Sequence, residues 1–305
     1  MNNWKDSKSV FITTFLPGTV WLTAFFLVPL GFVWVMSFGE KYGIIDIVIT
    51  WTPNNYLRAV ESIYLGIIWK SVWISALVTA LCLMVSFPIA FAVSFAKDKW
   101  KPILLLIIIL PFWINLLIRT YALIAVFRTR GHVNFGLEWL WEKANAGLIL
   151  IGLGKHQFLG EKFQPLAMLY NDFSVIAGLT YVYIPFIVLP IYAMLERLDR
   201  SYIEASLDLG ASQIRTLFSI VIPLTLPGII AGVILVFIPC LGSFVIPDLL
   251  GGTNSQMIGN VIERQFKSAN DWPFGAALSF LLMYVMFGVL AMRSLLTVRK
   301  SEMKV

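Results

Sequence analysis

The stretch from Leu195 to Pro227 reads LERLDRSYIEASLDLGASQIRTLFSIVIPLTLP and separates two long apolar runs. Its first half is charged, and Glu204 and Asp208 are four residues apart, so they share one face of a helix. Gly210 can adopt the left-handed conformation that ends a helix. Ser212 can cap a second helix, in which apolar residues recur at helical spacing. We expect a helix, a glycine turn and a second helix, exposed to water at one membrane face and suited to docking onto a soluble partner.

The composition is that of a membrane protein. Of the 305 residues, 59% are hydrophobic and 13% are charged, whereas soluble domains carry about 25% charged residues. The apolar residues come in blocks of about 20 or more, the length needed to cross roughly 30 Å of hydrocarbon. The expected fold is an all-α integral membrane protein, one polytopic domain over residues 1–305. Its six transmembrane helices are expected at about 14–38, 71–96, 102–127, 173–195, 228–247 and 272–292.

Six spans would place both termini and the loop 196–227 on the same side of the membrane. Lys/Arg residues are denser in the segments on that side, which the positive-inside rule identifies as cytoplasmic. The net charge of +6 therefore needs no nucleic-acid partner to explain it. We expect membrane lipid to surround the chain. We expect residues 128–172 to be a polar connection on the opposite side.

The chain shows no sign of enzyme chemistry. It has no G-x4-G-K-[ST] phosphate loop, no G-x-S-x-G elbow and no H-E-x-x-H pair. Cys82 and Cys240 lie inside apolar runs, and His132 and His156 have no partners at metal-ligand spacing. We therefore expect no catalytic residue, metal or cofactor in this chain. If it performs driven transport, the energy must come from another subunit. A stand-alone secondary transporter and a membrane-embedded enzyme remain less favoured alternatives, because inverted repeats and buried acids are missing.

The loop resembles a motif of the permease subunits of bacterial ABC importers, E-A-A-x3-G-x9-I-x-L-P. Here it stands as Glu204-Ala205-Ser206, Gly210 and Ile220-Val221-Ile222-Pro223, with Ser206 and Ile222 as mild departures. The resemblance implies the type I ABC importer permease fold, with a cytoplasmic coupling helix that inserts into a groove of an ATPase subunit. The residues that it assigns to coupling are Tyr202, Glu204, Ala205, Ser206, Asp208, Leu209 and Gly210.

Three further blocks are similar to permeases of spermidine/putrescine importers. They are PFW at 111–113 with LIRTY at 117–121, FVIPDLLGG at 244–252 with MIGN at 257–260, and DWPFG at 271–275. The resemblance implies a bacterial inner-membrane protein and one of two unlike permease subunits. Its partners would be two ATPase subunits that bind ATP, a periplasmic polyamine-binding protein and a small cationic substrate. Related permeases import other solutes such as ferric iron or sulfate, so that alternative stays open.

A polyamine path needs carboxylates, carbonyls and aromatic faces, because a cation–π contact is worth about 0.5–2 kcal/mol. The aromatic residues could instead serve packing, and the acids could be ordinary helix-end residues. Arg119 would repel a cation, so we expect it to pair with a loop carboxylate or to contact a docked binding protein. We expect Pro185, Pro190 and Pro239 to let the fourth and fifth spans bend. The candidate path residues are Trp113, Asn115, Tyr121, Asp172, Tyr181, Tyr183 and Asp248.

Overall fold

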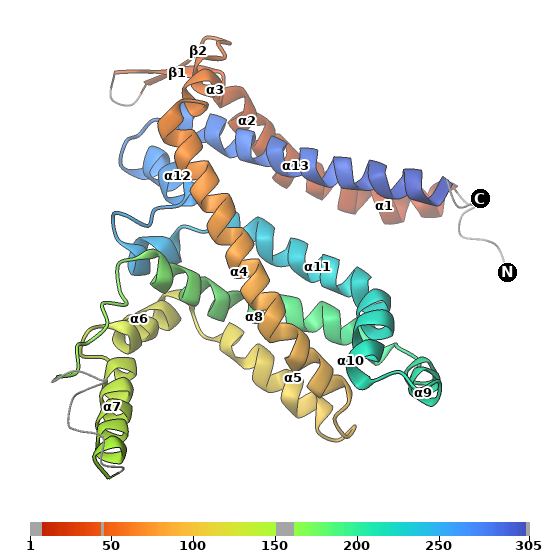
Figure 1. The fold of residues 1–305 in the computed structure, drawn as a ribbon. Helices are drawn as coiled ribbons and strands as arrows, with labels where there is room; N and C mark the ends of the chain where they lie inside the picture. Colours follow the sequence, from red (N-terminus) through yellow and green to blue (C-terminus); the bar gives the residue numbers. More distant parts are fainter. Residues whose placement is uncertain (1–7, 44–45, 151–161, 303–305) are drawn as a thin grey trace. The chain divides into compact units, whose positions relative to one another are not determined.

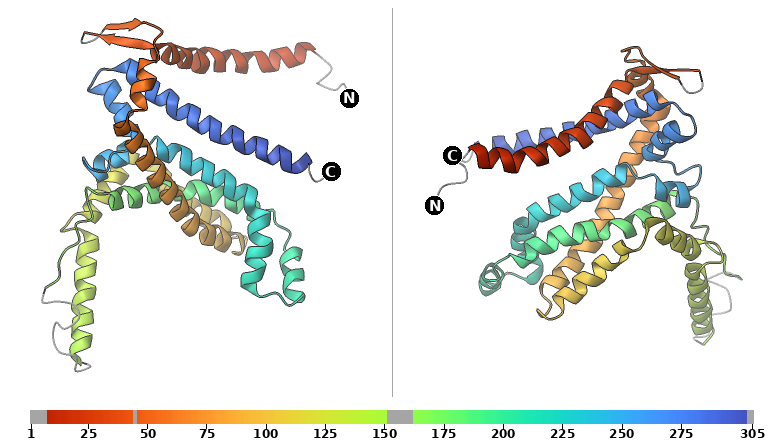
Figure 2. Two further views of the ribbon diagram at one scale, coloured as in Figure 1. Left: turned by 45° about the horizontal axis from the view of Figure 1, so that its top comes forward. Right: turned by 180° about the vertical axis from the view of Figure 1, so that it is seen from behind.

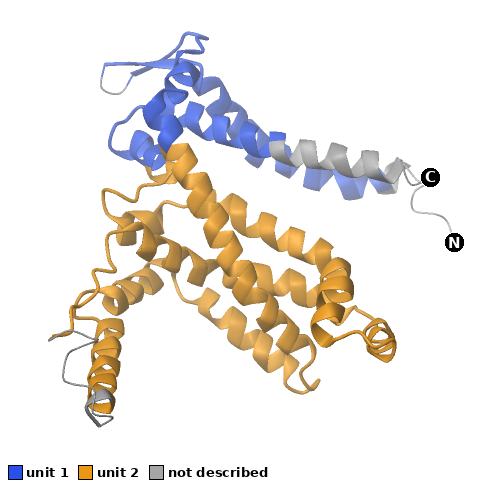
Figure 3. Ribbon diagram, in the orientation of Figure 1, with its two compact units in different colours: residues 1–66, 261–305 blue, residues 67–260 orange. Residues whose placement is uncertain are grey.

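The computed structural model describes residues 8–43, 46–150 and 162–302, which are almost entirely helical (Figure 1). The chain divides into two compact units, one made of residues 1–66 and 261–305 and one of residues 67–260 (Figure 3). The sequence predicts one polytopic domain and does not indicate these two units. Two helices cross the boundary along the chain, α4 (Ser62–Ser94) and α12 (Ile258–Lys267).

The first unit joins the two ends of the chain. An apolar helix is continuous through α1 (Lys8–Leu22), a π-helical turn η1 (Thr23–Leu27) and α2 (Val28–Met36). An antiparallel hairpin of β1 (Gly39–Tyr42) and β2 (Asp46–Ile49) follows, and then α3 (Asn54–Ala59).

Helix α13 (Trp272–Glu302) packs against α2 and α3. Arg58 donates to Asp271 at 2.9 Å, and its guanidinium carbon lies 3.9 Å from the centre of the Phe274 ring. The Trp34 indole donates to the Tyr284 hydroxyl at 2.6 Å. These contacts hold the N-terminal and C-terminal helices of this unit together.

The second unit is built on α8 (Asp172–Glu196) and α11 (Ile222–Leu241), which lie side by side (Figures 1 and 2). Two glycines of α11 allow this close approach, because a Cβ at Gly232 would lie 3.1 Å from the Ile187 Cα and one at Gly228 only 2.6 Å from the Pro190 carbonyl oxygen. Small residues allow helix backbones to approach in the same way throughout membrane proteins. The remaining elements are α5 (Lys101–Ile109), η2 (Leu110–Trp113), α6 (Leu116–Phe127), α7 (His132–Leu150), α9 (Ser201–Asp208), α10 (Gln213–Thr216), η3 (Leu217–Val221) and η4 (Pro247–Gly251).

The apolar helices agree with the expected integral membrane fold. Within the described ranges, four helical segments are long and apolar enough to cross a bilayer, at Phe11–Met36, Ser62–Ser94, Asp172–Glu196 and Gln213–Leu241. A bent pair beginning at Lys101 would be a fifth, and α13 contributes a shorter apolar stretch, Trp272–Gly288. The six expected spans correspond to these segments.

Several boundaries differ from the expected ones. The second helix begins at Ser62 rather than near residue 71, because Lys70 does not interrupt it and instead pairs with Asp172 at 2.8 Å. The fifth helix ends at Leu241, before Gly242, rather than near residue 247. The stretch 128–172 contains the helix α7 and is not only a polar connection.

The third expected span is broken. Lys101–Trp113 and the helical stretch that begins at Leu116 meet at an angle of 94°. Ile114 is extended, and the Asn115 side chain accepts the Leu117 N–H at 2.8 Å and so caps a new helix. An asparagine cap after Pro111 explains why an uninterrupted apolar run does not form one straight helix.

Candidate functional site

The loop between α8 and α11 forms the expected helix, glycine turn and helix. Helix α9 ends in a left-handed Gly210 with φ of +83°. The Ala211 N–H donates to the Ser206 carbonyl at 3.1 Å and the Gly210 N–H to the Leu207 carbonyl at 2.9 Å. These two bonds make up a Schellman motif. The Ser212 hydroxyl then accepts the Arg215 N–H at 3.3 Å, which caps α10 as expected.

A carboxylate just before α9 bonds the first N–H of the helix. The Asp199 carboxylate accepts the Ser201 N–H at 3.0 Å. This backbone hydrogen bond favours the ionised carboxylate and holds the pKa of Asp199 below its ordinary value.

One face of α9 is open to a partner. Tyr202, Glu204, Ala205 and Asp208 are exposed, and Leu209 is 89% exposed. Within the described part of the chain, the two carboxylates on this face have no ion-pair partner. The exposed leucine and the two carboxylates therefore lie together on a surface of α9 that the described part of the chain leaves uncovered.

The opposite face of α9 packs back onto the rest of the loop. The Ser206 hydroxyl hydrogen-bonds the buried Thr216 hydroxyl at 2.9 Å. This bond joins α9 to α10, so the serine that replaces alanine in the motif has a structural partner.

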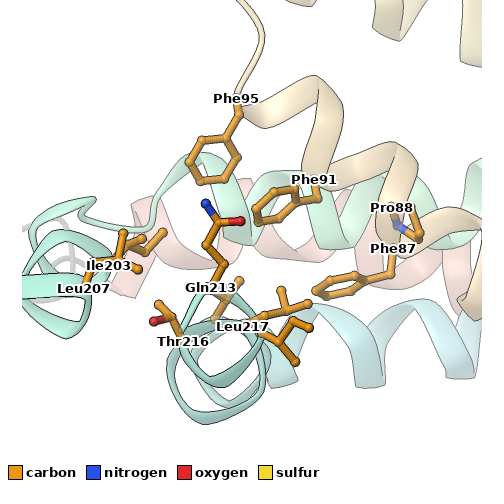
Figure 4. A pocket seen from close by; sticks show the side chains of 11 residues that line it. Phe87, Pro88, Phe91, Phe95, Ile203, Leu207, Gln213, Thr216 and Leu217 are labelled. Atoms are coloured by element: carbon orange, nitrogen blue, oxygen red, sulfur yellow. The ribbon is translucent and has the colours of Figure 1, made fainter. Parts of the chain in front are cut away.

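An apolar pocket of about 580 Å³ separates the loop from the end of α4 (Figure 4). Phe87 and Phe91 of α4, with Phe95 just after it, face the pocket on one side. Ile203 and Leu207 of α9 face it on the other. Helix α9 is therefore not packed tightly against α4 along its length.

The break in the third span forms an aromatic elbow, which we define as residues 111–115. The Phe112 ring packs edge-on against Phe186 of α8 at 4.8 Å, and Tyr183 lies 5.8 Å from Phe186. Trp113 points away from this packing and is 77% exposed.

The candidate path residues fall into two groups. Trp113, Asn115 and Tyr121 are exposed on the elbow and α6. Tyr183 is half-buried behind the elbow, whereas Tyr181 is exposed on α8.

The two acids belong to a second region, where α8 begins beside η4. The Ser174 hydroxyl and the Tyr170 N–H both donate to the Leu250 carbonyl at 2.8 Å. Asp172 is paired with Lys70, which offsets its charge. Asp248 is exposed and, among the residues that the structure describes, forms no ion pair. Asp248 is therefore the stronger candidate for contact with a cation.

Among the residues that the structure describes, no carboxylate pairs with Arg119 as we expected. Arg119 is 9% exposed, and its guanidinium carbon lies 5.5 Å from the centre of the Phe112 ring. Its Nε is buried and has no hydrogen-bond acceptor among the described residues. The contact with Phe112 links the two arms of the elbow, which gives Arg119 a structural role. Its burial within the chain's own packing does not favour a contact with a docked binding protein.

Two other expectations concern chemistry. In the described ranges, no group of three or more His, Cys, Asp or Glu side chains could hold a metal ion. His132 is exposed at the start of α7, and His156 lies outside the described residues. Cys82 and Cys240 are buried as free thiols.

The long apolar helices define the class of this protein as a helical integral membrane protein. The chain belongs to the family described as binding-protein-dependent transport system inner membrane component, whose model matches residues 9–300. This is a family of transport permeases rather than of enzymes, and the chain is the permease of an ABC importer that works with a binding protein. The resemblance to importer permeases is thereby confirmed.

The chain is also similar to individual proteins. It is 36% identical over 286 residues to the spermidine/putrescine transport system permease protein PotB of Salmonella typhimurium (strain SL1344), covering 94% of this chain and 92% of that protein. It is 37% identical over 266 residues to PotB of Escherichia coli (strain K12), covering 87% of this chain and 90% of that protein. The sequence blocks shared with spermidine/putrescine permeases reflect this likeness.

The fold is similar to that of a solved transporter. A chain in the crystal structure of a bacterial ABC transporter involved in the import of the acidic polysaccharide alginate matches with a TM-score of 0.66 at 15% identity, covering 97% of this chain and 98% of that chain. A crystal structure of bacterial alginate ABC transporter in complex with alginate pentasaccharide-bound periplasmic protein matches equally well, with a TM-score of 0.66. At this identity the likeness concerns the fold alone.

Proposed function

We propose that this chain is one of two unlike permease subunits of an ATP-driven importer for polyamines such as spermidine and putrescine. The observation that carries the proposal is the capped loop whose open face presents Tyr202, Glu204, Asp208 and Leu209. The likeness to PotB over most of both chains supports the substrate class.

Two separate ATPase subunits would bind the ATP, and no cofactor would bind to this chain. The groove of one ATPase would hold residues 202–210, and the loop and both termini would then lie on the cytoplasmic side. Closure of the ATPase dimer would then displace α9 and, through it, α8 and α11. Pro185 and Pro190 lie within α8 and Pro239 within α11. Each lacks a backbone N–H, so the helices can bend there at low cost.

The translocation path would run along the face that carries the elbow, with the partner permease forming the other half. Trp113 and Tyr121 offer exposed aromatic faces to ammonium groups. Asp248 offers a carboxylate that no cationic side chain pairs with among the described residues. Contacts of this kind are weak and exchangeable, which suits passage rather than tight binding. The periplasmic binding protein would then select the substrate.

Copurification with uptake tests this proposal. The tagged chain is purified from membranes, its companions are identified, and the complex is reconstituted with the cognate binding protein. We expect an ATPase and a second permease to copurify, and we expect uptake of labelled putrescine or spermidine that requires ATP. Unlabelled polyamine should compete, whereas ferric iron and sulfate should not. Uptake by the isolated chain would contradict ATPase-driven coupling, and competition by iron or sulfate would contradict the substrate class.

A further inference from the structure

The two ends of the coupling loop differ in how they contact α4. At the far end, the pocket of about 580 Å³ lies between α4 and α9. At the near end, the space lined by Ser94, Phe95, Glu196 and Arg200 is only about 30 Å³. We call residues 196–200, which join α8 to α9, the stem of the coupling loop. The stem is therefore packed against the end of α4 more closely than most of α9 is.

A buried lysine makes the main bond of this contact. Lys101, the first residue of α5, lies with its Nζ 2.8 Å from Glu196 Oε1 and 2.9 Å from Asp98 Oδ1. Its side chain is 10% exposed, whereas that of Glu196 is 39% and that of Asp98 is 96% exposed. The Lys101 ammonium holds the pKa of Asp98 below its ordinary value through a hydrogen bond and through charge. The ammonium has little access to water, and Glu196, the less exposed of the two carboxylates, is its main counter-charge.

Arg200 makes a second contact between the same two segments. It donates to the Ser94 carbonyl at 3.5 Å, and its guanidinium carbon lies 5.2 Å from the centre of the Phe95 ring. Arg200 is the residue that directly precedes α9. The stem therefore has one bond at each end, from Glu196 to the start of α5 and from Arg200 to the end of α4.

Helix α5 leads from this contact to the aromatic elbow. From Lys101 to Trp113 the helical segment is roughly 18 Å long at about 1.5 Å per residue. At its far end Phe112 packs against Phe186, a residue of the helix that also carries Glu196. The pair α5 and α8 is thus joined at both ends, by an ion pair at the coupling loop and by aromatic rings at the elbow.

We propose that Lys101 is a positioning residue that transmits displacement of the coupling loop to α5, and through α5 to the elbow on the translocation face. This inference rests on the proposed function and adds a second route to the one through α8 and α11. A movement of α9 pulls on the stem, and the Lys101–Glu196 bond makes α5 follow. The open pocket beside α9 leaves room for that movement.

Charge reversal and charge exchange test the inference. Lys101→Glu, Glu196→Lys and the double variant are made in the complete importer, in proteoliposomes with the binding protein, and ATP hydrolysis and uptake are measured together. We expect Lys101→Glu to lower uptake about tenfold, within the range usual for energetic coupling between sites, while hydrolysis continues. The double variant should regain most of the uptake, since the nearby Asp98 is almost fully exposed and its repulsion is screened.

Three variants complete the design. Lys97→Glu changes the same charge at an exposed position of the same turn and should transport normally. Lys101→Arg keeps the charge and should retain uptake. Lys101→Gln replaces Lys101→Glu if the latter is not inserted in the membrane, and it should show the same loss.

Normal uptake by Lys101→Glu or Lys101→Gln would overturn the inference, as would a double variant that is inserted normally but stays inactive. Gly210→Pro, tested in parallel, separates this result from failure of the proposed function. If Gly210→Pro abolishes uptake and the Lys101 variants do not, only the role of Lys101 is wrong. If none of them affects uptake, the coupling loop itself is wrongly assigned.

Discussion

Single residues carry two of the predictions, and Gly210 gives the sharper one. Its φ of +83° excludes proline, whose φ is held near about −65°, and proline would also remove the bond from the Gly210 N–H to the Leu207 carbonyl. We expect Gly210→Pro to abolish uptake while the protein remains in the membrane, as measured by uptake and by immunoblotting of membranes. Gly210→Asn, which tolerates the left-handed region, should retain most of the activity. Normal uptake by the proline variant would count against the loop as the coupling element.

Asp248 carries the second prediction for a single residue. Asp248→Asn removes the charge and keeps the size, and an exposed ion pair is worth roughly 0.2–1 kcal/mol. We expect the polyamine concentration that half-saturates transport to rise about two- to fivefold, the ratio that this energy corresponds to. The measurement is uptake against concentration, and Glu138→Gln, at another exposed acid, is the control. An unchanged half-saturation would show that Asp248 is not on the cation path.

Among the elements, the pairing of α8 with α11 depends on Gly232. A leucine there would drive atoms into the Ile187 backbone, which lies 3.1 Å from the position of a Cβ. Overpacking of this kind costs typically about 1–3 kcal/mol, so Gly232→Leu should lower the midpoint of thermal unfolding in detergent. Gly31→Leu is the matched control, because nothing lies within 4 Å of its Cβ position. Equal stability of the two variants would contradict the close packing of α8 and α11.

The elements also show which parts of the fold the sequence predicts. The coupling loop is predicted correctly because its signals are local, with Gly210 and Ser212 within a few residues of the helices that they end and begin. The elbow is not predicted, because Asn115 caps a helix inside a run that is otherwise apolar. Helix α7 is not predicted either. Its Asn134 side chain forms hydrogen bonds with Leu166, 32 residues away, and a contact at that separation leaves no local sequence signal.

The same distinction applies to the candidate site. The exposed residues of α9 follow from the motif itself. The ion pair of Lys101 with Glu196 joins residues 95 apart, and the contact of Arg119 with Phe112 requires the 94° bend. The spacing of these residues along the chain predicts neither contact. Arg119 is buried, and within the described ranges it packs on Phe112 rather than on a carboxylate.

At the scale of the whole molecule, the proposed function makes this chain one of two permease subunits that are driven by separate ATPase subunits. Its long apolar helices are suited to a bilayer, and the residues that the structure describes include no metal cluster. In the proposed function, the drive for transport enters at the exposed loop between α8 and α11, the two helices that pack against each other. The central claim is that the open face of α9 binds a separate ATPase on the cytoplasmic side.

Cross-linking from Leu209 tests that claim most directly. Leu209 is 89% exposed, and Cys82 and Cys240 are buried, so a cysteine placed at 209 can be labelled selectively with a photoreactive maleimide. In membranes that contain the complete importer, illumination should join this chain to an ATPase subunit, and a membrane-impermeant maleimide should reach position 209 only from the cytoplasmic side. Labelling from the periplasmic side, or the absence of any adduct with an ATPase, would contradict the account.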